Sequence, residues 1–473
     1  MNLKGVLTAA TLMLAASAPI FATAQEATLS VGQAKSLSQQ LINNGQAPTA
    51  FQILTVVTEN NPDDAEAHLL LSSAAREIGQ TDVSVDAGKR AYRISGDPEL
   101  KYVAARLVAV GLAEEENYSF AQLWLRLARQ YAPNDTENRR IAVEYQQLRR
   151  LNPWSFSASI GVAPSANING GSESTTGYLD DNVDEGLASF LAAFGIYDPE
   201  TGLRLLGDNE RALSGIEGRF NFGAQYRLSA DQTSATFLSA NLGAYRYRLS
   251  DEAEEISPTS ENSDFSRDTL SFGIRHVRVL AEDMRPATFS FGIGKNWYGG
   301  DPSNRFVTAS FSQPFLVSPK DLLTLGVSTS ASASYSDDIP IRTFGVNAQW
   351  ASILPEGDRI RTSVAVTKSN SSIEDSDYTS LSAGVTYSFA QPIFGAGVTL
   401  TSDARIANIG DTRFAPFDRE DTTVSVGANI AIPAAEVFGF QPVVKLLAER
   451  TRSTVDQFDS EGASVGFDFQ SSF

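Results

Sequence analysis

The chain lacks cysteine altogether and has only two histidines among its 473 residues. Without cysteine it can form neither disulfides nor thiolate metal sites, and it cannot carry a lipid on an N-terminal cysteine. The histidines, His68 and His276, fall in segments of different pattern, so no zinc centre is expected from them. No serine has a histidine at a spacing that suggests a general base. We therefore expect no catalytic, cofactor-binding or metal-binding residues and no enzyme activity.

Long hydrophobic runs and an excess of positive charge are also missing. After the first residues, no stretch offers eighteen consecutive apolar residues, which excludes transmembrane helices. Lys and Arg number 37 against 56 Asp and Glu, giving a formal charge of −19. Nucleic acid binding requires basic patches, so no nucleic acid partner is expected. This acidity leaves a membrane β-barrel open, because barrels contact lipid through an apolar band.

The first residues predict a signal peptide over 1–24. Lys4 supplies the positive start, and Val6 to Ala18 is a short apolar run. Small residues at Ala22 and Ala24 then predict cleavage before Gln25. The run is too short for a membrane anchor and is followed by a proline. The chain is therefore expected to be exported.

Residues 25–151 show a helical pattern in which one spacing recurs. Small or apolar residues at intervals of 4 and 3 are followed, 4 or 5 residues later, by a proline: Ala50, Leu54, Val57 and Pro62; Ala87, Ala91, Ile94 and Pro98; Ala121, Leu125, Ala128 and Pro133. This spacing is typical of the second helix of a tetratricopeptide repeat (TPR). The alternative is a helical bundle with alanine-rich faces, but the combined match favours TPR-like packing. Stacked repeats present a concave groove that holds peptides or protein segments.

Residues 152–473 change to a period of two, with Gly, Ser, Thr, Phe, Tyr and Val prominent. The segment 219–228 alternates polar and apolar residues, as do 424–430 and the last strand. The candidate strands number fourteen, an even number, as closure of a membrane barrel with both ends on one side requires. The fourteen expected strands lie near 155–164, 215–228, 234–249, 266–280, 286–298, 304–316, 320–335, 341–353, 358–369, 376–390, 392–405, 421–432, 440–451 and 461–473.

The expected connections alternate in length along the chain. Long ones fall at 165–214, 250–265, 370–375, 406–420 and 452–460, and short ones at 229–233, 281–285, 317–319, 354–357 and 390–391. Long loops outside and short turns inside are typical of outer-membrane barrels, and a soluble β-sandwich does not require them. The predicted fold class is therefore α + β multidomain, with N-terminal TPR-like repeats followed by a 14-stranded antiparallel transmembrane β-barrel.

The entry to the barrel reads Asn152-Pro153-Trp154-Ser155-Phe156, and Gly161-Val162-Ala163-Pro164-Ser165-Ala166-Asn167-Ile168-Asn169 follows. This stretch resembles the start of the barrel in the surface lipoprotein assembly modulator (Slam) family of Gram-negative bacteria. That family also joins a periplasmic TPR-containing domain to a fourteen-stranded outer-membrane barrel. The resemblance implies export of surface lipoproteins, or of secreted relatives that acquire haem or metal, across the outer membrane. Phe467, Phe469 and the terminal Phe473 look like the signal that the barrel-assembly machinery reads.

The polar and aromatic residues at the start of the expected barrel each allow two interpretations. Trp154 is either an aromatic anchor at the membrane interface, which we favour, or a packed hinge between the domains. Asn167 and Asn169 either pin the first outer loop through side-chain-to-backbone bonds or serve as turn residues, which residue type favours slightly. Asn152 and Pro153 complete the expected domain junction.

The longest connection, 165–214, is rich in acidic residues and contains an apolar stretch, Leu187 to Phe194. It is either a gate folded into the lumen or a solvated surface loop, and the sequence favours neither. Basic side chains are expected on lumenal faces at Arg219, Arg227, Lys295, Arg361 and Lys445.

These features predict an outer-membrane protein exporter whose periplasmic domain receives a protein client or its chaperone. The partners are then the client, outer-membrane lipid and the barrel-assembly machinery. The alternatives are an exopolysaccharide export porin with a TPR arm, in which an acidic lumen would suit a cationic polymer, and a general porin with a periplasmic docking arm.

Overall fold

The computed structural model describes residues 29–179, 183–336, 338–372, 374–412 and 415–471. The predicted signal peptide with Ala22, Ala24 and Gln25, and the terminal Phe473, lie outside the described residues. The chain divides into two compact units between Pro153 and Trp154. The first unit is helical and the second is a β-barrel, so the predicted fold class is confirmed.

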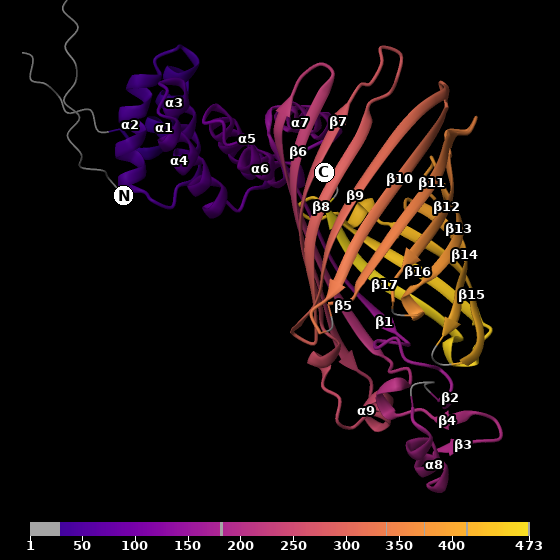
Figure 1. Cartoon of the computed structure of the whole chain (residues 1–473). Coiled ribbons are helices and arrows are strands. Elements are labelled where there is room, and N and C mark those ends of the chain that lie inside the picture. Colours follow the sequence, from indigo (N-terminus) through magenta and orange to yellow (C-terminus); the bar gives the residue numbers. More distant parts are fainter. Residues whose placement is uncertain (1–28, 180–182, 337, 373, 413–414, 472–473) are drawn as a thin grey trace, which may run out of the picture. The chain divides into compact units, whose positions relative to one another are not determined.

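The described part of the N-terminal unit contains seven helices (Figure 1): α1 (Val31–Asn43), α2 (Ala47–Asn60), α3 (Ala65–Glu77), α4 (Thr81–Ile94), α5 (Pro98–Glu114), α6 (Tyr118–Gln130) and α7 (Asp135–Leu151). Each helix packs against the next, and α3 also contacts α1 and α5. Contacts between both successive and alternate helices are what a stack of helix pairs produces. The unit is therefore TPR-like.

Local sequence signals set the helix ends. Ser30, Asp64 and Asn134 each accept a hydrogen bond from a backbone N–H of the helix that follows, which satisfies donors that the helix leaves unpaired. Gly45 and Gly79 end α1 and α3 with φ of 71° and 75°, a backbone conformation that glycine adopts without strain. The turns between helices are consequently short and fixed.

The second unit is a closed barrel in which every neighbouring pair of strands is antiparallel. Its fourteen strands are β1 (Trp154–Ser165), β5 (Gly215–Ala230), β6 (Ser234–Leu249), β7 (Arg267–Arg278), β8 (Ala287–Tyr298), β9 (Asp301–Ser318), β10 (Asp321–Ser334), β11 (Pro340–Ile353), β12 (Arg359–Asn370), β13 (Tyr378–Ser388), β14 (Gly397–Thr412), β15 (Ala415–Ala431), β16 (Phe440–Ser453) and β17 (Ser460–Ser471). Strands of 11 to 18 residues are long enough to cross a bilayer when tilted.

The two ends of the barrel differ. The chain enters at the end where strands are joined by 231–233 and 319–320, which we call the turn end. The opposite, loop end carries the connection 166–214, with β2 (Thr176–Tyr178), α8 (Glu185–Ala193), β3 (Tyr197–Asp198) and β4 (Leu203–Leu205), and the connection with α9 (Asp251–Ile256). In Figure 1 these elements project beyond the ends of the strands.

Two predicted connections were wrong. The expected loop 406–420 is largely strand, because β14 and β15 extend to Thr412 and from Ala415. Conversely, the expected strand start at 392 is a tight turn, in which Ile393 bridges Ala396 and Phe394 has φ 51°. Residues 406–412 do not alternate strictly, because the pairing of β14 with β15 shifts register at Asn408, Gly410 and Thr412. Charged residues in this segment also favoured a loop, although an outer strand end tolerates them.

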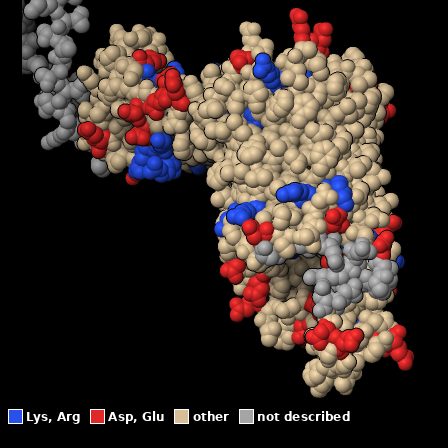
Figure 2. All heavy atoms as spheres, viewed as in Figure 1, with Lys and Arg blue, Asp and Glu red and all other residues tan. Residues whose placement is uncertain are grey.

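The outer wall of the barrel is apolar. Along each strand alternate side chains face outward, and exposed residues of this face include Ile160, Phe220, Phe272, Phe291, Val346, Val366, Leu381, Val426 and Phe467. On the face seen in Figure 2 an uncharged belt lies between charged residues near the two ends of the barrel. Such a belt suits the hydrocarbon core of a membrane and is unfavourable in water. None of the described helices is long and apolar enough to cross a membrane.

Candidate functional site

The recurring small residues of the helical unit form its core. The second-helix positions Ala50, Leu54, Val57, Ala87, Ala91, Ala121, Leu125 and Ala128 are all buried, whereas Ile94 is partly exposed. The three prolines are exposed, and they do not act alike. Pro62 and Pro133 follow α2 and α6, but Pro98 is the first residue of α5, where proline costs no backbone hydrogen bond.

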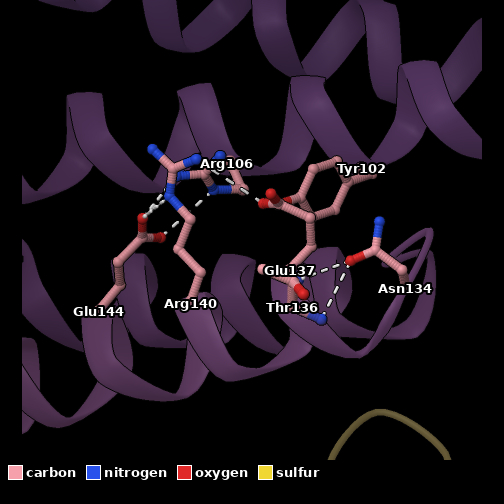
Figure 3. A network of polar contacts seen from close by, with 7 residues as sticks. All are labelled: Tyr102, Arg106, Asn134, Thr136, Glu137, Arg140 and Glu144. Carbon is pink, nitrogen blue, oxygen red and sulfur yellow. Dashed lines mark hydrogen bonds and ion pairs between the residues drawn. The ribbon is translucent and has the colours of Figure 1, made fainter.

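A polar network joins α5 to α7 (Figure 3). Tyr102 donates a hydrogen bond to Glu137, and the Arg106 guanidinium binds Glu144 through two nitrogens. Arg140 lies 3.4 Å from the same Glu144 carboxylate and so links the two pairs along α7. Burial, followed by the bond to Glu137, raises the pKa of Tyr102 to about 12. This network fixes the last helix of the stack against the third repeat.

The expected junction residues belong to two different environments. Asn152 is buried at the end of α7, where its Nδ2 donates to Gln122 Oε1 at 2.9 Å and to Ser119 Oγ at 3.1 Å. Trp154 starts β1, where its ring stacks on Phe156 and packs against Tyr226, with centroids 5.7 and 4.8 Å away. Trp154 is 44% exposed on the outward face, so its contacts support the aromatic-anchor reading.

Asn167 and Asn169 lie beyond the loop end of β1, far from the junction in the strand register. The Asn169 amide donates to the carbonyls of Asn209 and Arg211 and accepts from the Leu213 N–H, so it ties the start of the connection to its end. Asn167 bonds the backbone of Gly171 in both directions. The bonds support the pinning reading over the turn reading that residue type favours.

The long connection is anchored at its base and projects from there. Ile168 and Leu213 are buried in a cluster with Tyr247, Leu249 and Phe265 at the mouth of the barrel. Its middle continues outward, and none of the residues of α8 is buried. The described part of the segment therefore resembles a surface subdomain more than a plug inside the lumen.

The part of the subdomain next to this base is held together by its own polar contacts. Arg204 binds both oxygens of Glu210 at 2.7 and 2.6 Å, and these bonds lower the pKa of Glu210. On the side of the neighbouring strand β17, the Tyr178 N–H donates to Gln457 Oε1, and the Glu461 N–H donates to Glu173 Oε1. The connection is thus attached to the β16–β17 side of the mouth as well as to β6.

The lumen wall is polar and carries more basic than acidic side chains. The basic residues on inward positions are Arg219, Arg227, Arg267, Arg275, Arg359, Arg361, Arg405, Arg419 and Lys445, and the acidic ones are Glu217, Asp403, Asp421, Glu449 and Asp468. One expected lumenal residue was wrong: Lys295 pairs in register with Leu270 and Arg305 and therefore faces outward. Its ammonium lies over the rings of Trp297 and Tyr335.

The seam between the first and last strands has a feature that sequence reasoning missed. Arg219 of β5 reaches across β1 and binds Asp468 of β17 at 2.9 Å, and Lys445 of β16 binds the same carboxylate. Gly161 makes this possible, because a Cβ at that position would overlap Asp468. The β1–β17 register comprises only four residue pairs, so this ion pair supplements a short ladder. Phe467 and Phe469, the expected assembly-signal residues, flank Asp468 and point outward.

The described residues contain no group of three or more histidines and acidic residues arranged to hold a metal ion. No protein-family model matches the sequence, and no curated protein matches it.

Solved structures of two kinds are similar to parts of the chain. A BenF-like porin from Pseudomonas fluorescens Pf-5 is 9% identical and covers 67% of this chain and 98% of its own, with a TM-score of 0.34. An outer-membrane channel from Pseudomonas putida F1 is also 9% identical and covers 67% of this chain and 94% of its own, with a TM-score of 0.33. The Yersinia enterocolitica type III secretion chaperone SycD, in complex with a peptide of the translocator YopD, is 16% identical and covers 26% and 91%, with a TM-score of 0.23. The chain itself is a closed fourteen-stranded β-barrel preceded by a TPR-like helical domain.

Proposed function

We propose that the protein is an outer-membrane exporter that passes a protein client through its barrel, with the helical domain in the periplasm as receptor for the client or its chaperone. The observation that carries this proposal is the joining, in one chain, of a TPR-like helix stack to a closed fourteen-stranded barrel. A plain porin needs only the barrel, whereas a helix stack of this kind offers a surface that binds extended protein segments. The Slam resemblance narrows the client to surface lipoproteins or secreted proteins that acquire haem or metal.

The orientation of the proposal follows from the chain path. The helical domain precedes Trp154, where the chain enters the barrel at its turn end. Short turns face the periplasm in outer-membrane barrels and long loops face outward. The connection 166–214 would then lie at the cell surface, and the barrel-assembly machinery would insert the chain from the periplasmic side.

The basic lumen wall bears on the polysaccharide alternative. That alternative depended on an acidic lumen for a cationic polymer, and the inward residues favour an anionic solute instead. The helical domain is better explained by a protein client, so export of protein is the preferred function.

The test is co-expression with tagged candidate clients, followed by protease treatment of intact cells. Export predicts a client that is cleaved from outside only in cells that also express the full chain. A matched chain lacking residues 31–151 should still assemble a barrel but leave the client protected. If neither chain exposes any candidate client while small solutes still pass, the protein is a porin with an arm. If both chains expose a client equally, the helical domain is not its receptor.

A further inference from the structure

A groove of about 590 Å³ lies in the barrel wall at the turn end. Its inward-facing lining combines apolar and basic side chains, contributed by β9 to β12: Pro314, Leu316, Leu322, Ile353, Arg359 and Arg361. Leu316 and Ile353 are 53% and 43% exposed, which is unusual for apolar residues on the polar side of a barrel. The groove therefore offers an uncovered apolar floor inside the lumen.

Two arginines without a partner among the described residues stand beside this apolar floor. Arg359 and Arg361 stand two residues apart on β12, so their side chains point to the same side. Within the described part of the chain, no hydrogen bond, ion pair or ring contact holds either guanidinium. By contrast, Arg219 and Arg419 of the same lumen wall each bind a carboxylate. An arginine of the lumen wall that has no carboxylate partner in the protein can bind a carboxylate of a ligand.

The other charged residues of the groove lining also favour an anionic ligand. Arg285 and Lys320 also line the groove, at the neighbouring turns. The one acidic residue of the lining, Asp321, is on an outward position and accepts a hydrogen bond from Ser318 Oγ at 2.6 Å. The inward face of the groove thus has positive potential over an apolar floor, which attracts anions in a lumen of low dielectric walls.

We infer that this groove is a binding site for an extended acidic segment of the transported client, one in which acidic and apolar residues alternate. An extended chain lying edge-on in the groove turns one row of side chains toward β12 and the other toward β9 to β11, and the spacing within a row matches that of Arg359 and Arg361. Carboxylates of the client would bind the two guanidinium groups, and its apolar side chains would cover Leu316 and Ile353. That the bound segment belongs to the client rests on the proposed function. Binding of an acidic segment in the groove does not depend on that function.

The experiment measures how strongly added peptides block the single-channel current of the full chain in a planar bilayer. The probe is a short peptide of alternating glutamate and leucine, compared with a lysine–leucine peptide of the same length, each added to either side. We expect the acidic peptide to block far more strongly. The Arg359→Gln/Arg361→Gln variant should raise its blocking concentration about tenfold for each arginine lost. The matched control is Arg405→Gln, which removes another inward arginine that lies outside the groove, over the Tyr378 ring; its block should be unchanged.

Equal block by both peptides, or equal weakening by Arg405→Gln, would overturn the inference and leave only general attraction to the pore. Open-channel conductance of each variant reports whether the barrel has assembled. Because the peptides replace any client, the outcome is separate from export. If block depends on the arginines but no client is exported, the groove binds acidic segments and the proposed function is wrong. If a client is exported but block does not depend on the arginines, the proposed function stands and the binding site in the groove does not.

Discussion

Single residues decide how this barrel closes. Gly161 and Gly466 leave space on the inner wall through which Arg219 reaches a carboxylate on the last strand. The Asp468 side chain is only 6% exposed and has two cationic partners, so its charge is fully compensated. Both cations are partly exposed, so removing the carboxylate charge costs about the net value of the charge-assisted hydrogen bonds that it accepts.

Asp468→Asn should therefore destabilise the barrel by about 1.5–3 kcal/mol, the usual range for hydrogen bonds to charged groups. Urea unfolding in lipid vesicles, followed by tryptophan fluorescence, measures the change. Asp403→Asn is the matched control, because Asp403 also lies over a glycine, Gly384, yet has no ion pair among the described residues. If the two variants lose the same stability, the ion pair does not secure the seam.

At the scale of elements, the outer connection is a subdomain on a fixed base. The base consists of the Asn169 bonds and the buried Ile168 and Leu213, and the part from Ser172 to Arg211 is joined by a bridge between those two residues. The sheet β2–β4–β3 and α8 stand beyond this bridge and outside the strand ends. Their removal should leave the lumen as it is.

Replacing residues 173–210 by a short Gly–Ser linker should accordingly change single-channel conductance by less than about twofold, because the pore's dimensions are set by the strands. Planar bilayer recordings of the full chain and the deletion variant give the comparison. An increase of several fold would mean that the segment blocks the pore and would restore the gate hypothesis. The same deletion with Asn169→Ala should loosen the mouth further, visible as faster proteolysis near 166–172.

Features set by local residue patterns could be predicted from the sequence, whereas contacts between distant residues could not. The strand pattern was readable because outward apolar residues repeat every second position, a local signal that a membrane enforces. The turn 389–396 was missed because Phe394 has positive φ, which a bulky residue rarely adopts. The same backbone conformation occurs in a second Phe-Gly pair, Phe438 and Gly439. Arg219 and Asp468 are 249 residues apart, so no local pattern could have paired them. The groove was missed for the same reason, since it is assembled from several strands.

At the scale of the whole molecule, the charge is divided unevenly. The chain has a net charge of −19, yet the inward side chains of the barrel are mostly basic. Charges on the lumen wall lie within a Debye length, about 10 Å at ordinary salt, of a passing ion, whereas the acidic tip near α8 stands outside the strands. The lumen should therefore control selectivity.

The reconstituted channel should consequently prefer anions. Its reversal potential in a potassium chloride gradient should lie toward the chloride equilibrium potential, and Arg359→Gln/Arg361→Gln should shift it toward zero. The shift should shrink as salt concentration rises, because screening shortens the range of the wall charges. Cation preference in the unmodified protein would show that the outer acidic residues dominate the pore.

Transport of a client by this protein alone would show directly whether it is an exporter. Vesicles containing the purified full chain as their only protein are given an unfolded, tagged client on the side of the helical domain, and protease is then added to that side. We expect part of the client to become protected inside the vesicles, and a chain lacking residues 31–151 to protect far less. Full digestion of every client in vesicles that conduct ions normally would contradict it.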